Sequence, residues 1–435
     1  MSNTWFRLRR GFFLSFFPSD TPHYENVPFE VPSSWVWCRL EDIAYVASGS
    51  TPDKTCFVEN GVPYIKMYNL RNQKIDFAYH PQYITEEVHN GKLQRSRTEV
   101  GDLIMNIVGP PLGKLAIIPT TLPQANFNQA AVLIRPYKFK EVLVSYLKVY
   151  LEEMSEINSI ATRGSAGQVN ISLTQSQNMR IPIPPLNEVR RIIEEVSKYD
   201  ILIDSLKQNI TDIQNLIAYT KSKILDLAIH GKLVPQDPND EPAIELLKRI
   251  NPDFTPCDNG HYPVGWIETI LGELFSHNTG KALNSSNKEG IFKDYLTTSN
   301  VYWNKFDFTA IKQMPFKESE LNKCTVTKGD LLVCEGGDIG RSAIWNYDYD
   351  ICIQNHIHRL RPKIDLCVPF YYYTFAYLKE NNLIGGKGIG LLGLSSNALH
   401  KIEMPLPPLA EQQRIVQKIE ELFSVLDNIQ NALEV

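Results

Sequence analysis

Apolar residues recur every three or four positions through a long segment in the middle of the chain. No glycine or proline interrupts residues 188–229, and Gly231 and Pro235 follow. A 3.5-residue repeat kept over more than four heptads is typical of a coiled coil, and it predicts a helix roughly 60 Å long. The positions of this first seam are Val196, Tyr199, Ile203, Leu206, Ile210, Ile213, Ile217, Thr220, Ile224 and Leu227.

The same repeat returns in the last residues of the chain. This second helix would be some 37 Å long, so pairing the two helices leaves part of the first seam uncovered. Coiled coils are usually scaffolds, but a long uncovered apolar stripe is an interaction site or a liability. We therefore expect a partner on these helices. The second seam is Ile415, Ile419, Leu422, Leu426, Ile429 and Leu433.

The chain contains an internal repeat with an offset of about 225 residues, far longer than the roughly 20–50 residues of solenoid units. Order is kept throughout, so the pattern indicates a duplicated domain with a trailing helix. The matching pairs are Trp35 and Trp266, Gly101-Asp102 and Gly329-Asp330, Gly113-Lys114 and Gly340-Arg341, Gln129 with Arg135-Pro136 and Gln354 with Arg361-Pro362, and residues 181–186 and 404–409.

Each copy mixes two kinds of local pattern. Short apolar runs such as 102–107 and 330–334 are bounded by glycine and proline and predict strands. Segments such as 142–154 and 369–380 predict helices. The expected fold class is therefore mixed α/β: two similar globular domains separated by long antiparallel coiled-coil helices, with a pseudo-two-fold internal repeat.

Composition narrows the function classes. The chain has 435 residues, of which 43% are apolar, and a net charge of −5. Such a chain can bury ordinary cores, and it is not a wholly basic coat for nucleic acid, so any phosphate-binding face must be local. Seven cysteines without a C-x-x-C pair fit a reducing cytoplasm. No stretch approaches the roughly 18 apolar residues of a membrane span, and the apolar run 11–17 lacks a signal-peptide cleavage site.

Motifs for catalysis or metal binding are incomplete. Residues 109–114 miss the P-loop spacing and its Ser or Thr, and 386–390 miss the dinucleotide spacing. His356 and His358 share one face of a predicted strand but have no clear third ligand nearby, so we expect no metal site. Asp53-Lys54 fits a turn better than a nuclease site.

Residues 181–192, their copy 404–415, and residues 230–243 resemble the junctions of type I restriction–modification specificity (S) subunits. The resemblance covers nearly everything from about residue 20 onward, although the first 20 residues and the short last helix depart from the pattern. It implies a non-catalytic subunit whose two target-recognition domains each read half of a bipartite double-stranded DNA site.

The same resemblance implies partners. Two methyltransferase (M) subunits would dock along the helices and restriction/translocase (R) subunits would join them. S-adenosylmethionine, Mg and ATP would be bound by those partners only, and this chain would carry no cofactor. Two alternatives stay open: the specificity chain of a related type IIB/IIG-like enzyme, and a non-specific scaffold with degenerate recognition domains.

The repeat and the resemblance together suggest five segments. Residues 1–30 are an N-terminal segment of uncertain status, 31–186 and 251–409 are target-recognition domains, 187–250 is a central helical region, and 410–435 is the C-terminal helix. We expect the apolar seam positions to bind the partner subunits, namely Val196, Ile203, Leu206, Ile210, Ile213, Ile217, Ile224, Leu227, Ile419, Leu422, Leu426 and Ile429.

Residues shared by the two copies should build the fold or grip phosphate, because shared contacts cannot confer different specificities. Differing polar residues on matching loops are better candidates for reading bases. For Asn69 and Asn300, turn formation is an equal explanation. The candidate DNA-contacting residues are Lys114, Arg341, Arg163, Ser165, Gln168, Asn170, Lys387, Asn69, Asn300, Gln129 and Gln354.

Overall fold

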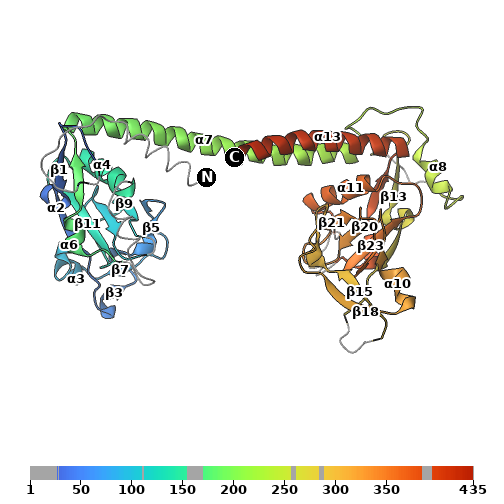
Figure 1. The fold of residues 1–435 in the computed structure, drawn as a ribbon, viewed down its shortest axis with the longest axis horizontal. Helices are drawn as coiled ribbons and strands as arrows, with labels where there is room; N and C mark the ends of the chain where they lie inside the picture. The colour runs from blue at the N-terminus through green and yellow to red at the C-terminus, as the bar shows by residue number, and fades with distance from the viewer. Residues whose placement is uncertain are drawn as a thin grey trace. The chain divides into compact units, whose positions relative to one another are not determined.

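The computed structural model describes residues 27, 29–109, 112–153, 170–255, 261–283, 289–384 and 394–434. The chain divides into two compact units, Met1–Ser205 (unit 1) and Leu206–Val435 (unit 2), each coloured as a continuous range in Figure 1. Each unit carries its own sheets and its own hydrophobic core, so each is considered by itself.

A four-stranded antiparallel sheet forms the centre of unit 1. Its order is β2 (Ala44–Ser48), β11 (Ala131–Pro136), β8 (Leu103–Asn106) and β9 (Leu115–Ile117). Every residue of β8 is buried, because α4 (Lys140–Glu153) packs on the core of one face while loops and the second sheet cover the other. This explains why the strand reads as an unbroken apolar run rather than an alternating one.

Smaller elements surround this sheet in unit 1. A second sheet has the order β10 (Asn126–Phe127), β4 (Val62–Ile65), β7 (Tyr83–Ile84) and β3 (Phe57–Val58), and β1 (Val36–Arg39) pairs with β12 (Arg180–Ile183). A hairpin of β5 (Leu70–Arg71) and β6 (Lys74–Ile75) projects beside β9. The short helices are α2 (Leu40–Ile43), α3 (Glu86–Asn90) and α6 (Leu173–Gln177).

Unit 2 repeats this arrangement, which confirms the predicted duplication. Its central sheet has the order β14 (Phe275–Thr279), β23 (Ile357–Pro362), β20 (Leu331–Cys334) and β21 (Ser342–Ile344). The second sheet is β18 (Lys312–Phe316), β15 (Ile291–Leu296), β22 (Ile351–Ile353) and β19 (Thr325–Val326). The matching pair is β13 (Ile267–Ile270) with β24 (Glu403–Leu406), and the matching hairpin is β16 (Val301–Tyr302) with β17 (Lys305–Phe306). The helices are α8 (Ala243–Lys248), α9 (Leu271–Leu274), α10 (Glu318–Cys324), α11 (Val368–Glu380) and α12 (Ser396–His400).

The shared aspartates hold the turn that precedes the central strand in each unit. Asp102 is fully buried and its Oδ2 lies 2.6 Å from Nη2 of Arg135, while Lys140 Nζ lies 2.7 Å from Oδ1. Asp330 makes the same bidentate contact with Arg361, at 2.8 and 2.7 Å. Each carboxylate also accepts the backbone N–H three residues earlier. These shared residues therefore build the fold, one of the two roles expected for them.

The long helix α7 (Leu186–Ile229) begins in the core of unit 1, where Val189 is buried, and ends in the core of unit 2. Within unit 2, α13 (Leu409–Leu433) runs back beside the last part of α7 (Figure 1), and Lys221 pairs with Asp427. A strict 3.5-residue seam does not persist to the end of α7, contrary to expectation. Ile224, Leu225, Ala228 and Ile229 are all buried, because this end rests on the broad core of unit 2.

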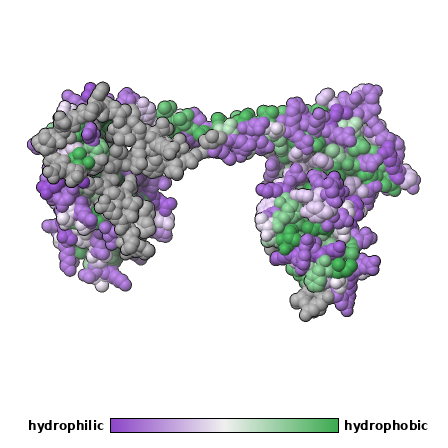
Figure 2. All heavy atoms as spheres, in the orientation of Figure 1, coloured by the Kyte–Doolittle hydropathy of each residue, from purple (hydrophilic) through white to green (hydrophobic). Residues whose placement is uncertain are grey.

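Much of the middle of α7 presents apolar side chains at its surface, seen as green atoms along the helix in Figure 2. Among the predicted seam positions, Leu206 is 52% exposed and Ile213 is 39% exposed, whereas Ile217 is buried. None of the helices in the described part of the chain is both long and apolar enough to span a membrane. Further large exposed side chains on α7 are Ile201, Leu202, Leu216 and Tyr219.

Candidate nucleic-acid interface

Several predicted residues of unit 1 meet at the end of strand β8. The Asn106 side chain accepts the N–H of Lys114 through Oδ1, which closes the loop between β8 and β9. The next residue, Ile107, donates its N–H to the carbonyl of Ala130, beside Gln129, and accepts the N–H of Ile171. Asn170 forms a β-bridge with Val108. Lys114, Gln129 and Asn170 therefore come from three distant segments to one end of the central sheet.

Unit 2 builds the same junction at the end of β20. The N–H of Cys334 bonds to the carbonyl of Arg341 at 2.8 Å, and Glu335 bonds through its N–H to His356 and through its carbonyl to Leu394. Gln354 lies at the turn that precedes β23. Arg341 and Gln354 thus lie at the end of the sheet that matches the Lys114 site.

The pairing of Gln129 with Gln354 as equivalent residues is wrong by one position. Gln354 donates its N–H to Leu296 and accepts the N–H of Ile357; in unit 1 Asn128 makes the corresponding bonds, to Ile65 and from Ala131. Asn128 is thus the counterpart of Gln354. The shared glutamine is a coincidence of neighbouring positions rather than a retained contact.

Asn69 and Asn300 do correspond, and each holds the base of its hairpin. Asn69 is 1% exposed, accepts the N–H of Lys66, and donates to the carbonyls of Asp76 and Tyr79. Asn300 accepts the N–H of Thr297 and donates to the carbonyl of Asp307 at 2.9 Å. These contacts account for both side chains by turn formation, one of the two roles considered for them.

The matching residues Lys114 and Arg341 differ in the contacts that their charged groups make within the chain. Arg341 stacks on Tyr302, its Cζ lying 4.9 Å from the ring centroid, and donates to the carbonyl of Thr298. Its Nε is buried and has no hydrogen-bond partner in the part of the chain that the structure describes. Lys114 is half-buried, and its ammonium has no ion-pair partner within the described segments. A cation without an internal partner is the better placed of the two to meet a phosphate.

The remaining candidates cannot be placed. Arg163, Ser165, Gln168 and Lys387 lie outside the described residues. The segment that holds the first three rejoins the described chain at Asn170, and the one that holds Lys387 rejoins it at Leu394. Their predicted DNA contacts stay predictions.

The two histidines expected on one strand face are separated by the fold. His356 precedes β23, is exposed and lies 3.3 Å from Glu335, whereas His358 is fully buried. His358 donates Nε2–H to the carbonyl of Leu394, so its Nδ1 accepts from Nε2 of His277 at 2.7 Å. Burial, with His358 and His400 nearby, lowers the pKa of His277 to about 4. Over the described ranges, no three His, Cys, Asp or Glu side chains are grouped to hold a metal ion.

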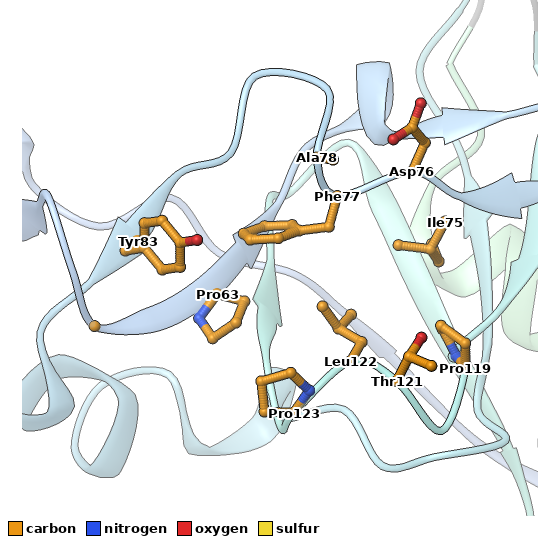
Figure 3. A pocket seen from close by; sticks show the side chains of 11 residues that line it. Pro63, Ile75, Asp76, Phe77, Ala78, Tyr83, Pro119, Thr121, Leu122 and Pro123 are labelled. Carbon is orange, nitrogen blue, oxygen red and sulfur yellow. The ribbon is translucent and has the colours of Figure 1, made fainter.

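A cavity lies beside each of the two hairpins. In unit 1 a cavity of about 440 Å³ has Pro63, Phe77, Tyr83 and Leu122 in its wall, and Figure 3 shows these side chains around one space. In unit 2 a cavity of about 580 Å³ lies against residues 305–309 of the matching hairpin. Burial also raises the thiol pKa of Cys38, to about 12, and of Cys324, to about 11, so little of the nucleophilic thiolate forms at neutral pH.

Sequence comparison accounts for the duplicated fold. The family model described as "Type I restriction modification DNA specificity domain" matches this chain twice, over residues 32–215 and 263–435. The chain belongs to this family. It is a DNA sequence specificity subunit, and such subunits are not catalytic, which confirms the function and the non-enzymatic role expected from the sequence.

Individual relatives and solved structures are similar along most of their length. The specificity subunit of the type I restriction enzyme EcoEI of Escherichia coli is 24% identical over 94% of this chain and 81% of its own length. A putative specificity subunit, MjaX, of Methanocaldococcus jannaschii is 23% identical over 92% and 89%. The crystal structure of the HsdS subunit from Thermoanaerobacter tengcongensis superposes with a TM-score of 0.56 at 19% identity, covering 93% of each chain. A structure from a study of type I R-M complex assembly and conformational transition gives 0.58 at 20%, covering 94% of each chain.

Proposed function

We propose that the two units read the two halves of a bipartite double-stranded DNA site, each with the end of its central sheet described above. The observation that carries this proposal is the convergence, in both units, of polar residues from distant segments on that end. Because the two ends carry different side chains, they would read different half-sites. α7 would act as the ruler between them, since its 44 residues correspond to about 66 Å.

Within this proposal the contacts fall into two kinds. Lys114 would neutralise a backbone phosphate, and Gln129 and Asn170 are exposed near it with side chains suited to base edges or phosphate oxygens. In unit 2, Gln354, the counterpart of Asn128, would make such a contact at the matching end of the sheet. The proposed interfaces are local, which is compatible with the negative net charge of the chain.

We expect two methyltransferase subunits. They would dock on the exposed apolar positions of α7, which include Leu206, Ile213 and Leu216. Restriction/translocase subunits would join that assembly. S-adenosylmethionine, Mg and ATP would belong to those partners, which would flip and methylate an adenine. Because the substrate is host DNA and incoming DNA, we place the complex in the cytoplasm. The segment boundaries given in the sequence analysis also remain proposals.

The proposal is tested by mapping methylated adenines in host DNA with and without this gene. We expect one split motif, two short specific sequences around an unspecified spacer, to lose its methylation when the gene is removed. Loss of no motif, or of a continuous one, would contradict it. Ile213→Asp should also abolish co-purification of the methyltransferase while both units keep their hydrogen-exchange protection.

A further inference from the structure

The two hairpins have different residues at their tips but similar residues on either side of the tips. Asn69-Leu70 and Asn300-Val301 lead into the hairpins, and Asp76-Phe77 and Asp307-Phe308 follow them. Between them, unit 1 carries Arg71-Asn72-Gln73-Lys74 and unit 2 carries Tyr302-Trp303-Asn304-Lys305. A common frame with different tips is what two readers of different sequences require.

Both tips are tied to the first residue of the next central strand, beside Lys114 or Arg341. In unit 1 the Oε1 atom of Gln73 accepts the N–H of Leu115 at 2.7 Å. In unit 2 the N–H of Asn304 donates to the carbonyl of Ser342 at 3.1 Å. The hairpins therefore belong to the same end of the sheet as the proposed interface.

The unit 1 tip turns at Asn72 and Gln73. Asn72 and Gln73 both have positive φ, 49° and 57°, as the two-residue turn of a type I′ hairpin requires. Glycine is the usual occupant of the second position, so Gln73 in that conformation carries strain, which its bond to Leu115 offsets. The Asn72 amide at the apex is exposed and makes no hydrogen bond to another described residue.

Arg71 is held in one orientation without being buried. Its Cζ lies 4.1 Å from the centroid of the Tyr79 ring, its Nε lies 3.6 Å from Asp76, and its side chain is 47% exposed. Asn69 fixes both neighbours by donating to their carbonyls. A stacked guanidinium with an exposed edge is pre-organised to donate two parallel hydrogen bonds.

We propose that the β5–β6 tip enters the major groove and reads the unit 1 half-site, with Asn72 contacting an adenine and Arg71 a guanine, while Gln73 positions the turn. An asparagine amide pairs with N6 and N7 of adenine, and a guanidinium pairs with O6 and N7 of guanine. A two-stranded ribbon fits the groove, which is about 12 Å wide. This inference rests on the proposed function and deepens it by naming the reading residues.

The unit 2 tip carries aromatic side chains at the positions of Asn72 and Arg71, and its asparagine, Asn304, stands at the position of Gln73. Trp303 replaces Asn72, and its ring packs edge-on against Tyr372 with centroids 6.1 Å apart; Tyr302 replaces Arg71 and lies under Arg341. At these two positions the tip offers apolar contact, suited to a thymine methyl group, in place of paired hydrogen bonds. The two half-sites should accordingly differ at the positions beneath the hairpins.

The test uses the full chain co-expressed with its methyltransferase subunit, and the readout is the genomic motif of methylated adenines. Asn72→Gly removes the amide but suits the positive φ, and Arg71→Lys keeps the charge but loses the paired donors. Each variant should relax one base position of the same half-site, with discrimination there falling about 10- to 100-fold, while the other half stays unchanged. Asn72→Gly should relax an adenine position and Arg71→Lys a guanine position.

Phe139→Gly is the matched control, because Phe139 is also an exposed residue of unit 1 with positive φ, 53°, but lies beyond the opposite end of β11. It should leave the motif intact; an equal relaxation by Phe139→Gly would overturn the inference. An unchanged motif in both Asn72→Gly and Arg71→Lys would also overturn it, while the proposed function stood. If the unaltered chain gave no split motif, the proposed function itself would fail.

Discussion

The two units share one frame and differ in what fills it. Their central sheets have the same strand order, and each is held by a buried aspartate paired with an arginine. Around that frame, Val46 and Val132 of unit 1 stand at the positions of His277 and His358 in unit 2. Lys114 has no ion-pair partner among the described residues of unit 1, whereas the matching Arg341 stacks on Tyr302 of its hairpin. Duplication has therefore preserved the sheet and diversified its edges, which is how one fold can serve two recognition tasks.

The largest expected difference between the units is in the free energy that the buried aspartate, Asp102 or Asp330, contributes to the stability of its unit. Asp102→Asn should lower the free energy of unfolding of unit 1 by about 2 to 3 kcal/mol, because it removes a fully buried carboxylate that pairs with two partly buried cations, Arg135 and Lys140, and leaves them only the exposed Glu99. Asp330→Asn should cost unit 2 only about 1 to 2 kcal/mol, since Arg361 is 37% exposed and water screens it. Hydrogen exchange followed separately in the two units measures both values, and equal costs would contradict the comparison.

The equivalent tryptophans should respond differently to the same change. Trp266 donates Nε1–H to Glu411 at 2.9 Å, whereas the buried Nε1 of Trp35 has no hydrogen-bond partner among the described residues. Trp266→Phe leaves a buried carboxylate without that donor, so it should destabilise its unit by about 2 kcal/mol more than Trp35→Phe does. Chemical unfolding of the two variants, followed by hydrogen exchange in each unit, tests this; a larger cost at Trp35 would refute it.

The histidine pair should make unit 2 more acid-sensitive than unit 1. The pKa of His277 is near 4 in the folded state and about 6.5 when unfolded, so the unfolded chain binds more protons between these values. Stability of unit 2 should therefore fall as pH drops from about 6.5 towards 4. His277→Val, which installs the unit 1 residue, should flatten that slope. A slope unaffected by the substitution would assign the acid sensitivity to other groups.

The smallest expected effect separates Lys114 from Arg341. Lys114→Ala should weaken DNA binding by the methyltransferase complex uniformly across sequences and reduce the slope of log affinity against log salt by about 1. Arg341→Ala should instead loosen the β16–β17 hairpin with little change in that slope, because the guanidinium is used internally. Filter-binding titrations at several salt concentrations distinguish the two.

The repeat, the long helix and the mixed α/β units were accessible from sequence because they depend on spacing and periodicity. The burial of four apolar residues at the end of α7 could not be predicted from the sequence. The heptad pattern cannot show that Ile224 and Leu225 meet a broad core rather than a second helix. The sequence suggested Gln129 as the counterpart of Gln354 because the two residues are identical. The true counterpart is Asn128, because structural equivalence is defined by the hydrogen-bond register and not by residue identity.

The candidate interface was predicted only in part. Lys114, Gln129 and Asn170 do lie at one end of the sheet. The hairpin tips could not be predicted from the repeat, because Arg71-Asn72-Gln73-Lys74 and Tyr302-Trp303-Asn304-Lys305 share only their last residue. The flanking asparagines and the Asp-Phe pairs did carry the signal. Their contacts with the hairpin base show why the frame is retained while the tips vary.

The central claim, that each unit meets DNA at its own place, is tested most directly by hydroxyl-radical footprinting of the methyltransferase complex on its methylated site. Two protected segments separated by an accessible spacer are expected, and Asn72→Gly should weaken protection in one of them only. A single continuous protected segment, or equal weakening of both segments by that substitution, would contradict the account.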